Sequence, residues 1–120
     1  MLSRIEYAQD HVRAELFDRR DAQETRDFLQ SVVACAAQHD CPRVLISVKS
    51  SAPLFKVEQY GLSKYFKILG GSRSYKVALV SDSDETHASH QYIEFLARQH
   101  GARVKSFRGD AAAMAWLHQD

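Results

Sequence analysis

Residues 43–48, RVLISV, and residues 75–80, YKVALV, decide the fold of this 120-residue chain. Each is a short, mainly apolar run that contains β-branched residues. A strand that is apolar at consecutive positions is buried on both faces, which is typical of a central strand in a parallel sheet. We therefore expect 44–48 and 77–80 to be neighbouring, buried, parallel strands.

The sequence before the first run predicts a β-hairpin followed by a helix. Polar and apolar residues alternate over 4–7 and again over 11–16, with a turn at Gln9-Asp10 between them. From Asp21 to about His39, apolar residues recur at three- and four-residue steps, as on one face of a helix.

The sequence after residue 48 predicts alternating helices and strands. The expected elements are a helix from Pro53 to about Leu69, a strand over 75–80, a helix from residue 84 to about His100, a strand over 102–107 and a helix over 111–118. Gly101 should end the third helix. We expect Asp110 to cap the last helix and Trp116 to anchor that helix in the main core.

These elements predict a single α/β domain over 1–120, with the order β-β-α-β-α-β-α-β-α. Strands that alternate with helices imply a mainly parallel sheet, and the opening hairpin makes it mixed. The helices should pack on the sheet. In such sheets, ligands bind beyond the carboxyl ends of the strands.

Composition narrows the class of protein. Hydrophobic residues make up 45% of the chain and charged residues 26%, which suits a globular domain with a core. No apolar run approaches the roughly 20 residues of a spanning helix, and no apolar leader follows Met1. We expect a cytoplasmic protein with no membrane span, in which Cys35 and Cys41 are reduced thiols.

Charge is concentrated in the middle of the chain. Residues 43–76 carry seven lysine and arginine side chains against one glutamate. This segment suits an anionic ligand, a lipid headgroup or an acidic partner, although a solvated helix face would show the same pattern. No aromatic-basic motif of the nucleic-acid binders accompanies the charge, so we expect no nucleic-acid partner.

The motifs that suggest chemistry are better explained by structure. Residues 80–86, VSDSDET, have the D-x-D-x-T spacing of aspartate-nucleophile phosphatases, but no further acidic pair follows, so helix capping is the simpler explanation. His87, His90 and Glu94 are expected on the solvated face of a helix, which makes a poor closed metal site. We expect no catalytic residues, no metal and no cofactor.

The junction after residue 48 is the expected functional site. Lys49, Ser50 and Ser51 stand at the carboxyl end of one central strand, and Ser81 and Asp82 at the end of the other. Amides at the start of a helix favour anions, and Lys56 lies close by in sequence. A bound anion or a phosphoserine would suit this junction, while the alternative is ordinary N-capping.

The chain resembles the STAS superfamily, in particular the stand-alone relatives of the anti-sigma-factor antagonist. The resemblance is clearest over 61–117, where YKVALVSD (75–82) is followed by a long helix, ARVKSF (102–107) and AMAWL (113–117). In phospho-switched members a serine follows the central strand in an Asp-Ser-Ser-Gly context. Ser50 and Ser51 match the two serines, whereas Lys49 replaces the acid and Ala52 the glycine.

The resemblance implies a non-catalytic module that binds a protein partner or a small anionic ligand. Similar folds bind lipids in a helix-lidded pocket, so a carrier or sensor of a small amphipathic ligand is the alternative function. The side chains expected to line such a pocket are Leu54, Phe55, Tyr60, Tyr65 and Phe66. The sequence leaves open whether the chain forms a homodimer.

Overall fold

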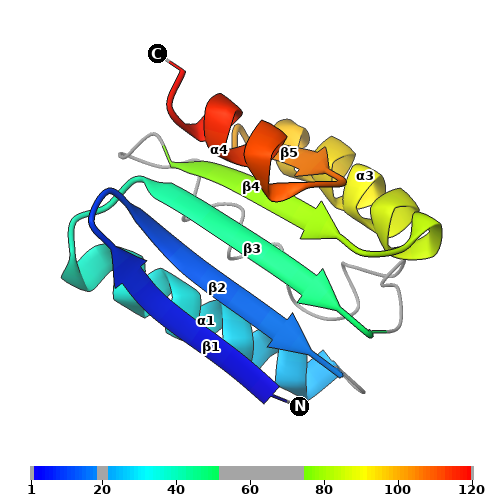
Figure 1. Ribbon diagram of the computed structural model, residues 1–120, viewed down its shortest axis with the longest axis horizontal. Coiled ribbons are helices and arrows are strands. Elements are labelled where there is room, and N and C mark those ends of the chain that lie inside the picture. Colours follow the sequence, from blue (N-terminus) through cyan, green and yellow to red (C-terminus); the bar gives the residue numbers. More distant parts are fainter. Residues whose placement is uncertain (1, 19–21, 52–74, 120) are drawn as a thin grey trace.

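A computed structural model describes residues 2–18, 22–51 and 75–119, which form an α/β arrangement around one five-stranded sheet (Figure 1). The described elements are β1 (Leu2–Ala8), β2 (His11–Phe17), α1 (Ala22–Gln38), β3 (Arg43–Lys49), β4 (Lys76–Ser81), α3 (Asp84–Gln99), β5 (Arg103–Phe107) and α4 (Asp110–Leu117). The helix expected from Pro53 to about Leu69 lies outside the described residues, so the full alternating order stays a prediction. None of the described helices has the length and apolar content needed to cross a lipid bilayer.

The strands lie side by side in the order in which they occur in the chain, from β1 to β5. β1 and β2 are antiparallel, and every later neighbouring pair is parallel. The hairpin turns at Gln9, whose φ is 61°, and the amide of Asp10 donates to the carbonyl of Ala8 at 2.7 Å. The predicted mixed, mainly parallel sheet with an N-terminal hairpin is therefore confirmed.

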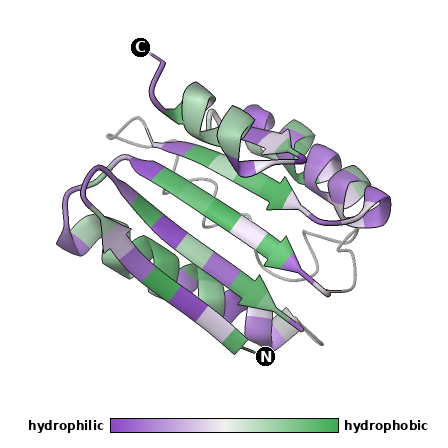
Figure 2. Cartoon of the chain, viewed as in Figure 1, coloured by the Kyte–Doolittle hydropathy of each residue, from purple (hydrophilic) through white to green (hydrophobic). Residues whose placement is uncertain are grey.

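The two apolar runs form the centre of the sheet. β3 pairs in parallel with β4, with Val44 opposite Val77, and residues 44–48 and 77–81 are buried. Figure 2 shows apolar colour along most of β3 and β4, while polar and apolar residues alternate in the hairpin. The prediction of two adjacent, buried, parallel strands is confirmed, because both faces of these strands are covered.

Two separate apolar clusters cover the two faces of the sheet. The buried members of the main core are Val12, Ala14, Leu16, Phe28, Val32, Ala36, Cys41, Val44, Ile46, Val48, Tyr75, Val77, Leu79, Ala97, Ala102 and Val104. A smaller cluster on the opposite face contains Leu45, Ala78, Val80, Ala113 and Leu117. α1 and α3 therefore share one face, and α4 lies on the other (Figure 1).

Two expectations about the last helix are wrong. Trp116 is partly buried and packs against the smaller cluster, at its margin, while Leu117 and Ala113 are the fully buried anchors. The N-cap is Gly109, which has no side chain to accept a hydrogen bond, and Asp110 is the first helical residue. Ala113 and Leu117 lie four residues apart on the side of α4 that meets the sheet, and the indole of Trp116 lies beside that contact.

The solvated face expected for α3 is also wrong. His90 is buried together with Thr86 and Ala97, while Phe95 is 59% exposed. Positions 86, 90, 93 and 97 form one stripe at three- and four-residue steps, and Ile93 packs against the main core. Tyr92 and Leu96 also pack against the main core, so the covered side of the helix includes His90 and leaves Phe95 outside.

Candidate functional site

The carboxyl ends of β2, β3 and β4 lie together along one side of the sheet. This side is called the Ser50 edge and is distinct from the outer strands β1 and β5. The amide of Asp18 donates to the carbonyl of Lys49 at 3.2 Å, which joins the ends of β2 and β3. The hydroxyl of Thr86, in the first turn of α3, lies 3.5 Å from the carbonyl of Ser51. The structure thus brings the predicted residues of β3 next to the start of the helix that follows β4.

Ser50 and Asp82 make the central contact of this edge. The amide of Ser50 donates to Oδ2 of Asp82 at 3.1 Å, and both residues are exposed. Ser50 adopts a φ of 51°, in the left-handed region, which costs an L-residue other than glycine about 1 kcal/mol or more. The carboxylate stabilises this conformation because it satisfies an amide that points out of the sheet.

Lys49 and Ser51 are each engaged locally. The hydroxyl of Ser51 donates to the carbonyl of Lys49 at 3.0 Å, which forms a tight turn after the strand. The ammonium group of Lys49 lies 5.8 Å from the centre of the Phe17 ring, within the range of a cation–π contact. Lys49 and Phe17 are partners in the β2–β3 register, so this contact lies on the face opposite the main core.

Ser81 belongs to the interior and not to the surface of the edge. Its side chain is buried, and its hydroxyl lies 3.5 Å from the carbonyl of Phe107 in β5. The helix start beside it is capped by Ser83, whose side chain accepts from the amide of Thr86 at 3.1 Å. Of the two residues predicted at the end of β4, Asp82 is therefore the exposed one.

The basic middle segment does not put all its charge at this edge. Arg43 and Lys76 begin β3 and β4, at the opposite end of the sheet. Nε of Arg43 donates to the carbonyl of Leu117 at 3.1 Å, and Nζ of Lys76 donates to the carbonyl of Trp116 at 2.9 Å. Both cations thus satisfy carbonyls at the carboxyl end of α4, where the helix dipole favours positive charge.

Carboxylates outnumber cations among the described residues of the edge. The acidic side chains there are Asp18, Asp82, Asp84 and Glu85, and the basic ones are Lys49 and Arg108. Nη1 of Arg108 pairs with Oδ1 of Asp84 at 2.5 Å. A small anion at the Ser50 amide would have to displace Asp82 and would meet these other carboxylates.

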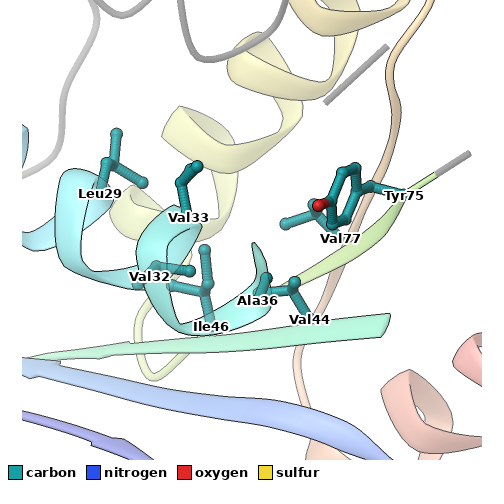
Figure 3. Close-up of a pocket in the computed structure, with 8 residues that line it drawn as sticks. All are labelled: Leu29, Val32, Val33, Ala36, Val44, Ile46, Tyr75 and Val77. Atoms are coloured by element: carbon teal, nitrogen blue, oxygen red, sulfur yellow. The ribbon is translucent and has the colours of Figure 1, made fainter. Parts of the chain in front are cut away.

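The remaining predicted site residues lie outside the described residues. These are Lys56 and the pocket candidates Leu54, Phe55, Tyr60, Tyr65 and Phe66. An apolar void does lie between α1 and the strands β3 and β4, lined by Leu29, Val32, Val33, Ala36, Val44, Ile46, Tyr75 and Val77 (Figure 3). Its volume is about 20 Å³, whereas a small-molecule site usually offers several hundred.

A second polar cluster joins the hairpin turn to α4. Oδ1 of Asp10 lies 2.9 Å from Nδ1 of His11, and Oδ2 lies 2.6 Å from Nε2 of His118. Nδ1 of His118 lies 2.9 Å from the carbonyl of Met114. Both nitrogens of His118 therefore face acceptors, so the doubly protonated imidazolium suits the site. Asp10 and His118 are far apart in the sequence, and no sequence pattern linked them.

This cluster shifts two pKa values in opposite directions. Hydrogen bonds from His11 and His118 lower the pKa of Asp10 from 3.8 to about 2. The hydrogen bond to the Met114 carbonyl and the one to Asp10 raise the pKa of His118, while the positive charge of Arg43 opposes that rise. Both groups are therefore charged at pH values between the lowered pKa of Asp10 and the raised pKa of His118.

No cluster of three or more histidine, cysteine, aspartate or glutamate side chains in the described residues is arranged to hold a metal ion. Cys35 is partly buried and Cys41 buried, and both are free thiols. Burial raises the pKa of Cys35. The redox state expected for Cys35 and Cys41 stays a prediction.

Comparison of the chain with family models, with curated proteins and with solved structures finds no match in any of the three.

Proposed function

We propose that this chain is a non-catalytic binding and regulatory module of the STAS type. It contacts a partner protein through the edge at which Ser50 of the β3 end meets Asp82 of the β4 end. The position of Ser50 and Ser51 after the central strand, which matches the switch serines of the resembling family, supports the assignment. The observation that carries the proposal is the hydrogen bond from the Ser50 amide to Asp82.

That hydrogen bond makes the edge sensitive to a single covalent change. Ser50 is exposed and held in a left-handed conformation by a neighbouring carboxylate. A phosphoryl group would add about −1.5 to −2 charges beside Asp82. Like-charge repulsion would separate Asp82 from the Ser50 amide, and the surface that a partner recognises would change shape and charge together.

A protein partner suits this edge better than a small anion does. The Ser50 amide already binds an internal carboxylate, and carboxylates prevail around it. The Ser51 hydroxyl donates its proton to the Lys49 carbonyl within a turn, and not to a general base that would activate the oxygen as a nucleophile. An exposed edge with fixed polar groups and no activated nucleophile favours recognition over chemistry.

The proposal is tested by capturing partners from a lysate of the host with three immobilised proteins. These are the wild type, Ser50→Glu and the control Arg4→Glu, which makes a larger change of charge, from positive to negative, on the exposed strand β1. A partner found with the wild type is then purified and titrated against all three. We expect affinity to fall about tenfold or more in Ser50→Glu and to stay unchanged in Arg4→Glu.

A triple variant, Ser50→Ala, Ser51→Ala and Lys56→Ala, completes the test. If the purified partner binds Ser50→Glu and this triple variant as tightly as the wild type, the binding surface lies elsewhere and the proposal is wrong. Circular dichroism of each variant confirms that it is folded before its affinity is measured.

A further inference from the structure

The outer edge of the sheet at β5 lies in a groove. β5 is the last strand of the sheet, with a neighbour on one side only among the described residues. The groove has a volume of about 430 Å³ and is lined by Lys76, Arg98, Ala102, Arg103, Val104, Lys105, Trp116 and Gln119. Residues 102–105 precede or belong to β5, Arg98 belongs to α3, Trp116 belongs to α4, and Lys76 begins β4.

Four of the eight lining residues are cationic and none carries a carboxylate. Arg98 is 70% exposed and pairs with Glu94 at 3.1 Å, one turn earlier on α3. Lys76 lies over the Trp116 ring at 5.1 Å, and its ammonium group donates to the carbonyls of Trp116 and Gln119. Arg103 and Lys105 are exposed on the strand, so the positive charge beside the backbone of β5 comes mainly from these two side chains.

The shape of the groove fits an extended chain. Four residues of strand span roughly 13 Å, which is longer than a single phosphate or carboxylate needs. An edge strand presents backbone N–H and C=O groups outward, and an incoming peptide can pair with them as an added strand. Alternate side chains of that peptide would then face Trp116 on one side of the sheet and Arg98 on the other.

Charge decides which peptide can pair. Basic residues on an outer strand repel a second copy of the same strand. They also disfavour a neutral segment, because the cationic side chains of β5 would lose water without gaining an acidic partner from that segment. A segment that carries glutamate or aspartate supplies that partner. We propose that the β5 groove binds an acidic, extended segment of a partner protein, which adds to the sheet beside β5.

This surface is independent of the Ser50 edge and is tested without it. Trp116 is the only tryptophan of the chain and lines the groove, so its fluorescence reports on occupancy. The probe is a synthetic seven-residue peptide of alternating glutamate and valine. We expect a saturable change in Trp116 emission with a dissociation constant below about 1 mM, weakening as salt is added.

Two controls separate strand pairing from simple charge attraction. The same peptide with N-methylated backbone amides keeps its charge but loses hydrogen-bond donors, and we expect it to bind about tenfold more weakly. Lys105→Glu should weaken binding of the unmodified peptide by about tenfold or more, and Lys105→Gln by less. Arg4→Glu, a matched reversal on the opposite edge strand β1, should have no effect.

Three results would overturn the proposal. The first is no saturable change in fluorescence with folded protein. The second is equal binding of the methylated and unmodified peptides, which would show that charge alone draws the peptide. The third is tighter binding of a single-stranded oligonucleotide than of the peptide, which would assign the groove to nucleic acid.

Discussion

Replacing Leu117 by alanine should destabilise the protein more than replacing the larger Trp116. The Leu117 side chain is 0% exposed and packs with Leu45, Ala78 and Val80 beneath α4. The substitution removes three carbon atoms, worth about 2.4 kcal/mol at about 0.8 kcal/mol each. The cavity left in a close-packed cluster adds to this, so we expect a loss of about 3–4 kcal/mol.

Trp116→Ala should cost less, about 1–3 kcal/mol. The indole is partly buried, and the substitution removes its contact with the Phe107 ring at 5.8 Å and with the ammonium group of Lys76. Each such contact contributes roughly 0.5–1.5 kcal/mol. The ranking of the two variants tests whether α4 is anchored by its buried leucine or by its aromatic residue.

The assay is urea unfolding followed by far-ultraviolet circular dichroism, because Trp116→Ala removes the fluorescent probe. With a denaturant slope of about 1.5 kcal/mol per molar, Leu117→Ala should lower the midpoint by about 2 M. A larger effect for Trp116→Ala than for Leu117→Ala would refute the reasoning. So would a loss of less than about 1 kcal/mol for Leu117→Ala.

Three further predictions concern the backbone, pH and metals. Gly101→Ala should cost about 1 kcal/mol in urea unfolding. The φ of Gly101 is +79° and an added Cβ would meet nothing within 4 Å, so the cost is backbone strain alone. An unchanged urea midpoint would contradict this. The ion pair of His118 with Asp10 should stabilise the fold most between about pH 4 and pH 6.5; the contribution is lost as pH rises through the raised pKa of His118, and also as pH falls toward the lowered pKa of Asp10, about 2. Urea midpoints measured across this range should depend less on pH in His118→Gln, and an unchanged profile would count against the ion pair. Zinc or magnesium should leave the melting temperature of the protein unchanged, whereas a saturable rise abolished by His87→Ala would reveal a metal site.

Periodicity predicted the sheet because burial follows from local pattern. The continuous apolar run at 44–48 and the alternation at 11–16 specify which faces are covered, and both strands lie where expected. The positions of the turns followed from residue type, as the positive φ of Gly101 illustrates. These features depend on neighbours in the chain and not on the final packing.

Packing between distant elements was less predictable. His90 was expected on the solvated face of α3, yet it is buried together with Ala97, while Phe95 is exposed. Trp116 was expected in the main core, yet Leu117 takes the buried position on the opposite face. Which side of a helix meets the sheet depends on shapes that a single sequence does not specify.

The candidate site was predicted in position but not in electrostatics. The order of the elements placed Ser50 and Asp82 at adjacent strand ends, and the structure adds the hydrogen bond between them. Positive charge was expected there because residues 43–76 contain many lysine and arginine side chains. Two of these residues, Arg43 and Lys76, lie at the other end of the sheet. A count of charges along a sequence ignores the direction of the strands that carry them.

Nuclear magnetic resonance mapping of the partner's footprint tests most directly whether a partner binds where Ser50 meets Asp82. Backbone amide resonances of the isotope-labelled protein would be followed as a partner captured with the wild type is added. We expect the largest shifts on residues 49–51 and 82–84, including the amide of Ser50 that donates to Asp82. Shifts elsewhere, with the resonances of Ser50 and Asp82 unmoved at saturation, would contradict it.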